Sequence, residues 1–194
     1  APEFIMGDRY DSIRSEAEPW SERGCRVLLL AAYDTAFDDG PLQSAHVAPI
    51  ALVFLSNLLR PDAQETFRYF ASQGVSVRVI SGDNPITVAQ IAARAGIENA
   101  DRYVDATTLS TEQDFEEAVK YYTVFGRVTP EQKRYLVRAF QKQGHTVAMT
   151  GDGVNDVLAL KDANCGIAMA SGSQAASQVA QIVLLNSQFS AMPA

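Results

Sequence analysis

The chain has 194 residues, of which 47% are apolar, enough for one good-sized domain or for one domain and part of another. The formal net charge of −7 disfavours nucleic acid as a partner, because the phosphate backbone requires a basic face. No apolar run reaches the roughly 18 residues of a membrane span, and no secretory signal is visible. We therefore expect these residues in an aqueous compartment. Cys25 and Cys165 are expected to be reduced and buried there, although a disulfide stays open.

The first 45 residues differ in pattern from the rest. Residues 8–24 predict one helix, disturbed by Pro19, and "CRVLLLAAY" at 25–33 predicts a strand. The polar stretch at 34–44, with Gly40 and Pro41, predicts a loop or hinge. We therefore expect a domain boundary near residue 45, with one domain over 1–45 and a second over 46–194.

After residue 45, apolar strands alternate with helices. The predicted strands are "APIALVFL", "VSVRVIS", "YTVFGRV", "HTVAMTG", "CGIAMA" and "QIVLL". Between most of them lie helical segments, which end at Gly74, Gly96 and Gly144. The last of these helices opens with a capping box of Thr129 and Gln132. Continuous apolar strands separated by helices predict an α/β fold with a doubly wound parallel sheet.

Ligands of such a sheet bind at the carboxyl ends of its strands, and polar groups follow several of them. Ser81 could donate a hydrogen bond to a phosphate oxygen, and Gly82 would let backbone amides approach the same oxygen. The alternative is a plain turn followed by Asp83 as a helix cap. Lys133 lies early on a helix and could reach a bound phosphate, or it could be a surface lysine. Its neighbour Arg134 is placed on the outer side of that helix.

The densest cluster is "MTGDGVND" at 149–156, where a strand passes into a helix. Asp152 and Asp156 would repel each other in a tight turn unless a cation lies between them, and magnesium suits such oxygens. Asn155 could orient one carboxylate or bind phosphate without adding charge. The alternative is an acidic turn with a helix cap.

The order Ser81, Lys133 and Asp152 with Asp156 resembles three motifs of the haloacid dehalogenase superfamily. In that family a serine or threonine and a lysine hold the phosphoryl group, and the late acidic pair holds magnesium. The resemblance implies a haloacid dehalogenase-like fold whose nucleophile is an aspartate on an upstream strand.

Within that superfamily the chain resembles P-type ATPases, bacterial cation pumps and their calcium-type group in particular. The similar segments are "SGDNPITVAQIAARAGI", "VFGRVTPEQK", "MTGDGVNDVLALKDANCGIAMASGS", the opening "APEF" and "GCRVLLLAAYD". The last two resemble parts of the nucleotide-binding domain, although "APEF" could also be foreign to the protein. The first 45 residues then read as a small α+β remnant of that domain, and the rest as the C-terminal part of the phosphorylation domain.

One family motif is missing, because the chain contains no DKTGT. "VDATTLS" at 104–110 is only superficially similar, and its Asp105 lies in the wrong order between the serine and lysine motifs. We therefore reject Asp105 as the nucleophile. The central strand of the sheet is expected to be absent from this chain, which would leave the neighbouring strands with unpaired edges.

The resemblance implies a cytosolic fragment of a pump that couples ATP hydrolysis, through an aspartyl phosphate, to cation transport. It implies catalytic roles for Lys133 and Asp152, phosphate binding by Ser81, Gly82, Asp83, Lys133 and Asn155, and magnesium binding by Asp152 and Asp156. It also implies nucleotide binding by Ala1, Pro2, Glu3 and Arg60. The domain would bind magnesium and ATP. Its partner would be the rest of the pump with its transmembrane helices, and it would lie on the cytoplasmic side of the cell membrane.

Two alternatives stay open at this point. One is a fragment of a soluble phosphatase of the same superfamily, which needs its own upstream nucleophile. The other is an inert module that binds magnesium and phosphate without turnover, which the missing aspartate implies for the isolated chain.

Overall fold

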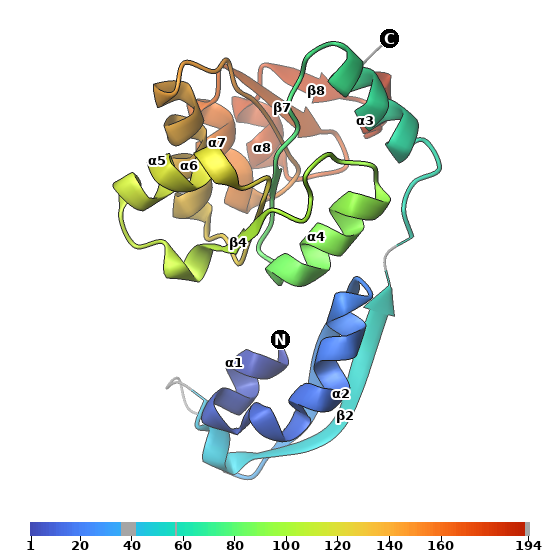
Figure 1. Ribbon diagram of the computed structural model, residues 1–194, viewed down its shortest axis with the longest axis vertical. Coiled ribbons are helices and arrows are strands. Elements are labelled where there is room, and N and C mark those ends of the chain that lie inside the picture. The colour runs from blue at the N-terminus through green and yellow to red at the C-terminus, as the bar shows by residue number, and fades with distance from the viewer. Residues whose placement is uncertain (36–41, 57, 193–194) are drawn as a thin grey trace. The chain divides into compact units, whose positions relative to one another are not determined.

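The computed structural model describes residues 1–35, 42–56 and 58–192 (Figure 1). The chain folds into two compact units, Ala1–Leu58 and Leu59–Ala194. Gly40 and Pro41, which the sequence assigns to a loop, lie outside the described residues. In the part of the chain that is described, no helix has the length and apolarity needed to cross a bilayer.

The first unit consists of helices that pack against a two-stranded antiparallel sheet. Its elements are α1 (Pro2–Met6), η1 (Gly7–Arg9), α2 (Asp11–Glu22), β1 (Cys25–Tyr33), η2 (Ser44–His46) and β2 (Val47–Ser56). The predicted helix forms as α2, which continues through Pro19. Cys25 is buried, and both cysteines are free thiols.

The pairing of β1 with β2 moves the boundary between the units. Cys25 pairs with Ser56, and Tyr33 pairs with Val47, so the whole of β2 belongs to the first unit. The boundary therefore lies after Leu58 in the structure, and the boundary predicted near residue 45 differs from it. The apolar run of β2 predicts a strand correctly, but an apolar pattern does not reveal which strand will pair with it.

The second unit alternates helices with short strands (Figure 1). Its helices are α3 (Ala63–Ser72), α4 (Pro85–Arg94), α5 (Glu112–Tyr121), α6 (Pro130–Lys142), α7 (Val157–Asp162) and α8 (Gln174–Val179). Its strands are β3 (Val79–Ile80), β4 (Tyr103–Asp105), β5 (Val124–Gly126), β6 (Ala148–Gly151), β7 (Cys165–Met169) and β8 (Ile182–Leu184). Three 3-10 turns complete it: η3 (Ala106–Thr108), η4 (Val154–Asp156) and η5 (Phe189–Ala191).

The strands of the second unit are parallel, which confirms the predicted α/β class. They form two sheets with the orders β3-β5-β4 and β6-β7-β8. One continuous sheet does not form among the described residues. Instead β3 and β6 each stand at the end of a sheet with one edge unpaired, as expected if a strand between them is missing.

Local signals in the sequence place the helices of this unit accurately. Gly74, Gly96 and Gly144 follow the ends of α3, α4 and α6 with φ values of 74°, 82° and 86°, a region that disfavours residues with a Cβ. The capping box of Thr129 and Gln132 is present at the start of α6. Helix α5 was not predicted, although Thr111 and Asp114 form the same kind of capping box before it.

Two apolar clusters form the core beside the candidate site. Phe115, Phe125 and Leu136 belong to the cluster that joins α5, β5 and α6. Val137 and Leu160 belong to the cluster that joins α6, α7 and β7. Helix α6 therefore contributes to both clusters, and its position governs the side chains it carries.

Candidate functional site

The turn after β6 is built around the carboxylate of Asp156. This side chain is buried, and its Oδ2 accepts hydrogen bonds from the backbone N–H groups of Asp152 (3.2 Å) and Gly153 (3.0 Å). A Cβ at Gly151 would lie 2.6 Å from the Cβ of Asp156. Glycine is therefore required at 151, because any side chain would displace the carboxylate that organises the turn.

The other oxygen of Asp156 binds Lys133. The distance from Nζ to Oδ1 is 2.6 Å, and only 13% of the lysine side chain and 8% of the aspartate side chain are exposed. Lys133 lies one turn into α6, where its N–H donates to the carbonyl of Thr129 (3.0 Å). The capping box at Thr129 therefore positions the lysine, and the alternative of a solvated surface lysine does not hold.

Asp152 is exposed, but its backbone is held firmly. Its carbonyl accepts a hydrogen bond from Ser173 N–H at 2.6 Å, and a Cβ at Gly172 would lie 2.3 Å from the same oxygen. No hydrogen bond or ion pair joins its carboxylate to another residue in the described part of the chain. Asn155 is likewise exposed on this turn. The site thus presents a carboxylate to solvent from a fixed backbone.

The Ser81 turn is bound to the segment that leads into α6. The carbonyl of Ser81 accepts from Val128 N–H (3.0 Å), and the carbonyl of Asp83 accepts from Arg127 N–H (2.8 Å). The Ser81 hydroxyl accepts from Asp83 N–H at 3.1 Å, and Gly82 is exposed. The turn therefore lies next to the connection between β5 and α6, which carries Lys133.

The helix cap at this turn is not Asp83. The Oδ1 of Asn84 accepts from Ile86 N–H at 2.9 Å and caps α4. The alternative interpretation of Asp83 as a cap is wrong, because the helix begins one residue later than that interpretation requires.

Asp105 has a structural role. One oxygen accepts from the backbone N–H and the hydroxyl of Thr107 (3.0 and 2.6 Å), and the other binds Arg127 at 2.6 Å. Burial raises the pKa of Asp105, but the hydrogen bonds from Thr107 and Arg127 outweigh burial and lower it. Asp105 also ends β4, which is separated from β3 by β5. This supports its rejection as the nucleophile.

The residues predicted to bind nucleotide fall in different units. Ala1, Pro2 and Glu3 lie at the start of the first unit, where Pro2 is buried at the beginning of α1. Arg60 is exposed in the second unit, ahead of α3.

The donor set limits how a magnesium ion could bind. Among the described residues no group of three or more His, Cys, Asp or Glu side chains could hold a metal. Magnesium commonly uses one or two carboxylates and takes its remaining ligands from phosphate and water, so Asp152 fits a partial site of this kind. The carboxylate of Asp156 is occupied by Lys133 and two N–H groups, which suits the support of a site better than direct binding.

Three contributing residues were missed from the sequence. Ser173 binds the Asp152 carbonyl, Gly172 allows the close approach of the two segments, and Arg127 binds both the Ser81 turn and Asp105. The small residues of "ASGS" after an apolar strand were a usable signal for close backbone packing. Arg134 also differs from expectation, because it binds Asp162 on α7 at 2.6 Å and does not simply face solvent.

The fold and this site define a class of hydrolase-like α/β domain, and the comparisons with known proteins agree. The haloacid dehalogenase-like hydrolase model matches residues 8–164. The chain is 50% identical over 194 residues to the calcium-transporting ATPase CtpE of Mycobacterium bovis, covering 100% of this chain and 24% of that protein. It is 42% identical over 194 residues to the probable cation-transporting ATPase exp7 of Streptococcus pneumoniae, covering 100% of this chain and again 24% of that protein.

Among solved structures, the chain is similar to a zinc-transporting PIB-type ATPase in its E2.Pi state. The TM-score is 0.58 at 25% identity, and the match covers 91% of this chain and 23% of that one. The chain belongs to the haloacid dehalogenase-like hydrolase family. The predicted resemblance to bacterial cation-transporting ATPases is confirmed, and the chain spans about a quarter of the length of these curated relatives, 24% in each case.

Proposed function

We propose that this chain is the C-terminal part of the phosphorylation domain, with the end of the nucleotide-binding domain, of a P-type ATPase that transports a cation. The single observation that carries the proposal is the buried Lys133–Asp156 pair beside the exposed Asp152, at the ends of strands in a chain similar to transporting ATPases along its whole length. The alignment with CtpE of Mycobacterium bovis starts at the beginning of the chain, which supports a place for Ala1, Pro2 and Glu3 in the nucleotide-binding domain. Nucleotide contacts by these three residues and by Arg60 remain part of the proposal.

The missing nucleophile has a defined place in this proposal. Ser81 follows β3 and Asp152 follows β6, and within the described part of the chain each of these strands has one edge without a partner strand. A parallel strand that paired with both edges would join the two sheets into one. Its carboxyl end would then carry an aspartate between Ser81 and Asp152, where ligands of parallel sheets bind.

In the reaction that we propose, a carboxylate oxygen of this aspartate attacks the γ-phosphorus of ATP, the bond from that phosphorus to the β,γ-bridging oxygen breaks, and ADP leaves, so that an acyl phosphate forms on the aspartate. Ser81 donates its hydroxyl to a phosphoryl oxygen, the backbone N–H of Gly82 donates to the same group, and Lys133 supplies a positive charge. Asp83 acts through its backbone N–H, which donates to the Ser81 hydroxyl and orients it. Asn155 donates its amide from the opposite turn. Bound magnesium would supply further positive charge, with Asp152 as its ligand.

We propose a revised role for Asp156, which the sequence assigned to the metal. Its buried carboxylate binds Lys133 and the N–H groups of Asp152 and Gly153, so it positions both the lysine and the turn that carries Asp152.

We place this domain on the cytoplasmic side of a cell membrane, with the membrane helices of the same protein as its partner. Calcium is the first cation to test, because relatives with 50% identity are calcium-transporting ATPases.

The test is acid-stable labelling by ATP. The full-length protein that contains this chain should take up label from γ-labelled ATP with magnesium, and hydroxylamine should release the label as expected for an acyl phosphate. The 194-residue chain alone should take up none, because it lacks DKTGT. Stable label on the isolated chain, or none on the full-length protein, would contradict the proposal.

A further inference from the structure

The interface of α6 with α7 holds the candidate site at one end. Lys133 of α6 binds Asp156, the residue before α7, at 2.6 Å. Beyond this pair, Val137 packs with Ala159 and Leu160 in a buried apolar cluster. Apolar packing alone tolerates small shifts along a helix axis, because it is not directional. Further directional contacts between the two helices would therefore help to define the position of α6 along α7, and with it the place where Lys133 meets Asp156.

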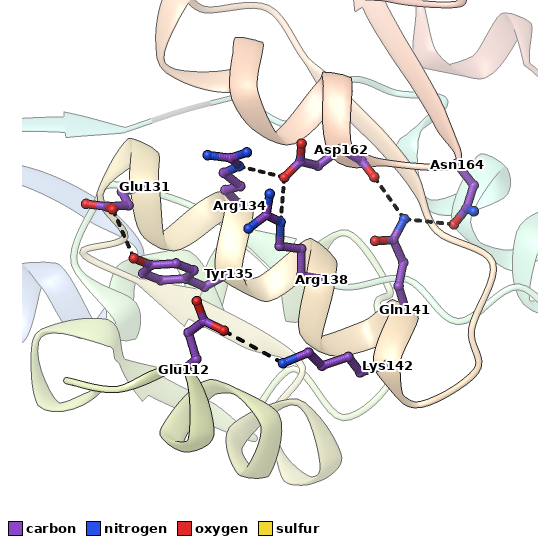
Figure 2. A network of polar contacts seen from close by, with 9 residues as sticks. All are labelled: Glu112, Glu131, Arg134, Tyr135, Arg138, Gln141, Lys142, Asp162 and Asn164. Carbon is purple, nitrogen blue, oxygen red and sulfur yellow. Dashed lines mark hydrogen bonds and ion pairs between the residues drawn. The ribbon is translucent and has the colours of Figure 1, made fainter.

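Asp162 provides such contacts (Figure 2). It ends α7, and its Oδ2 accepts from the Nε of Arg134 at 2.6 Å and from the Nε of Arg138 at 2.7 Å. Only 18% of its side chain is exposed, against 35% and 43% for the two arginines. One carboxylate of α7 thus binds two guanidinium groups on successive turns of α6.

A second set of hydrogen bonds extends this network to β6. The amide of Gln141 on α6 donates to the carbonyl of Asp162 (2.9 Å) and to Oδ1 of Asn164 (3.1 Å). The same Oδ1 accepts from the N–H of Val147, the residue before β6 (2.9 Å). The segment Asp162–Asn164 therefore joins α6, α7 and β6, the three elements that carry Lys133, Asp156 and the Asp152 turn.

The charge of Asp162 is maintained by its partners. Burial raises the pKa of this carboxyl, but the hydrogen bond from Arg134 and the charge of Arg138 outweigh burial and lower it. Loss of the carboxylate would leave the guanidinium groups of Arg134 and Arg138 without their shared counter-ion, and of this network only the hydrogen bonds of Gln141 would still join α6 to the end of α7.

We propose that Asp162 is a positioning residue for the phosphoryl site: by holding Arg134 and Arg138 it sets the position of α6 along α7 that places Lys133 on Asp156. The inference rests on the proposed function for its catalytic consequence. The geometric part of the inference is that Asp162 keeps the Lys133 ammonium on Asp156 and so protects it from chemical modification. This protection does not depend on turnover and can be measured without ATP.

The experiment compares lysine reactivity in the full-length protein. Limited acetylation followed by mass spectrometry gives the rate at which each lysine of this chain reacts. Asp162→Asn should raise the rate at Lys133 roughly fivefold, the effect of about 1 kcal/mol, and leave Lys120 and Lys161 unchanged. Asp162→Glu keeps the charge and should restore much of the protection. If Asp162→Asn lowers Tm too far for labelling, Arg138→Gln removes one contact from the opposite side and should act in the same direction.

Glu116→Gln is the matched control. Glu116 lies on α5 and binds Lys142 at 2.5 Å, and Lys142 lies on α6, the helix that carries Lys133. The side chain of Lys142 is already 56% exposed, so this variant should change the reactivity of Lys142 little and leave Lys133 protected. Unchanged reactivity of Lys133 in Asp162→Asn, or an equal rise at every lysine, would overturn the inference.

A second arm measures the initial rate of phosphoenzyme formation. Asp162→Asn should lower this rate roughly tenfold. Asp162→Glu should recover part of the rate, and Glu116→Gln should leave the rate unchanged. A wild-type protein that forms no phosphoenzyme would refute the proposed function, while the Lys133 reactivities would still decide whether Asp162 positions the lysine.

Discussion

The ammonium of Lys133 and the carboxylate of Asp156 form a buried ion pair, with 2.6 Å between Nζ and Oδ1 across 23 residues of sequence. The other carboxylate oxygen accepts the N–H groups of Asp152 and Gly153. A single side chain therefore links the lysine on α6 to the turn that presents Asp152. Displacement of either partner is expected to disturb the other, and several consequences can be measured.

Removal of the lysine charge should destabilise the fold as well as the site. Lys133→Met leaves Asp156 buried without its counter-ion, which typically costs about 3–5 kcal/mol of unfolding free energy. Lys133→Met combined with Asp156→Asn removes both charges and should recover part of this loss. Urea denaturation of the 194-residue chain measures both, with Lys161→Met on the exposed surface of α7 as a control that should change little. Additive losses in the double variant would show that the two residues do not act as a pair.

The catalytic role of Lys133 predicts a separate effect on rate. In the full-length protein, loss of a charge-assisted bond to phosphate should cost about 1.5–3 kcal/mol, roughly ten- to hundredfold in phosphoenzyme formation. Lys133→Arg keeps the charge but replaces a compact ammonium by a wide fork, so it should restore only part of the rate. Lys161→Met again serves as the control. The neighbouring Arg134 is not a suitable control, because it binds Asp162 at 2.6 Å. A wild-type rate in a folded Lys133→Met protein would remove the lysine from the mechanism.

A methyl group at residue 151 should disrupt the turn. The Cβ of Gly151→Ala would lie 2.6 Å from the Cβ of Asp156, so the turn or the carboxylate must move. Such overpacking typically costs about 1–3 kcal/mol, which a lowered denaturation midpoint of the chain would report. Gly82→Ala is the control, because its Cβ would meet nothing closer than the Val128 carbonyl at 3.8 Å. Equal stability of the two variants would contradict the packing argument.

Asp152 and Asp83 should differ in their effect on magnesium. In the full-length protein, Asp152→Asn should weaken magnesium-dependent phosphoenzyme formation at least roughly tenfold, since even outer partners of a metal site often cost about 10–100-fold. Asp83→Asn should have the smaller effect, because Asp83 binds the rest of the site through its backbone. Magnesium titration of the initial rate separates the two variants. Equal sensitivity would mean that Asp83 is also close to the ion.

The ion pair of Asp105 with Arg127 predicts a defined pH dependence of stability. Because the folded-state pKa of Asp105 lies below its ordinary value, its contribution is present above the unfolded-state pKa and is lost as pH falls through the folded-state pKa. Asp105→Asn should therefore cost about 1.5 kcal/mol at pH 7, at the low end for charged hydrogen bonds because the side chains are 23% and 24% exposed. The difference from wild type should shrink as the solution is acidified below the ordinary range of an aspartate. A difference that is the same at neutral and strongly acid pH would contradict this origin.

Much of the fold could be predicted because its signals are local. A helix that ends in a left-handed residue requires glycine, so Gly74, Gly96 and Gly144 mark three helix ends. The capping box at Thr129 places Lys133 one turn into α6 because a capping box fixes where a helix begins. A domain boundary that depends on which strands pair was harder to predict from the sequence. The strands β1 and β2 were both predicted, but their pairing with each other, and so the membership of β2 in the first unit, was not.

The residue types of the candidate site, their order, the α/β class and the absence of a nucleophile motif all follow from the sequence, because each can be identified from short segments and their spacing. Which of these groups meet depends on the tertiary fold. It paired Lys133 with Asp156, left Asp152 exposed, and used Asp162 to bind two arginines of α6. These contacts join residues more than 20 positions apart. Their partners are chosen by how helices and strands pack together, a choice that no local pattern of residues encodes.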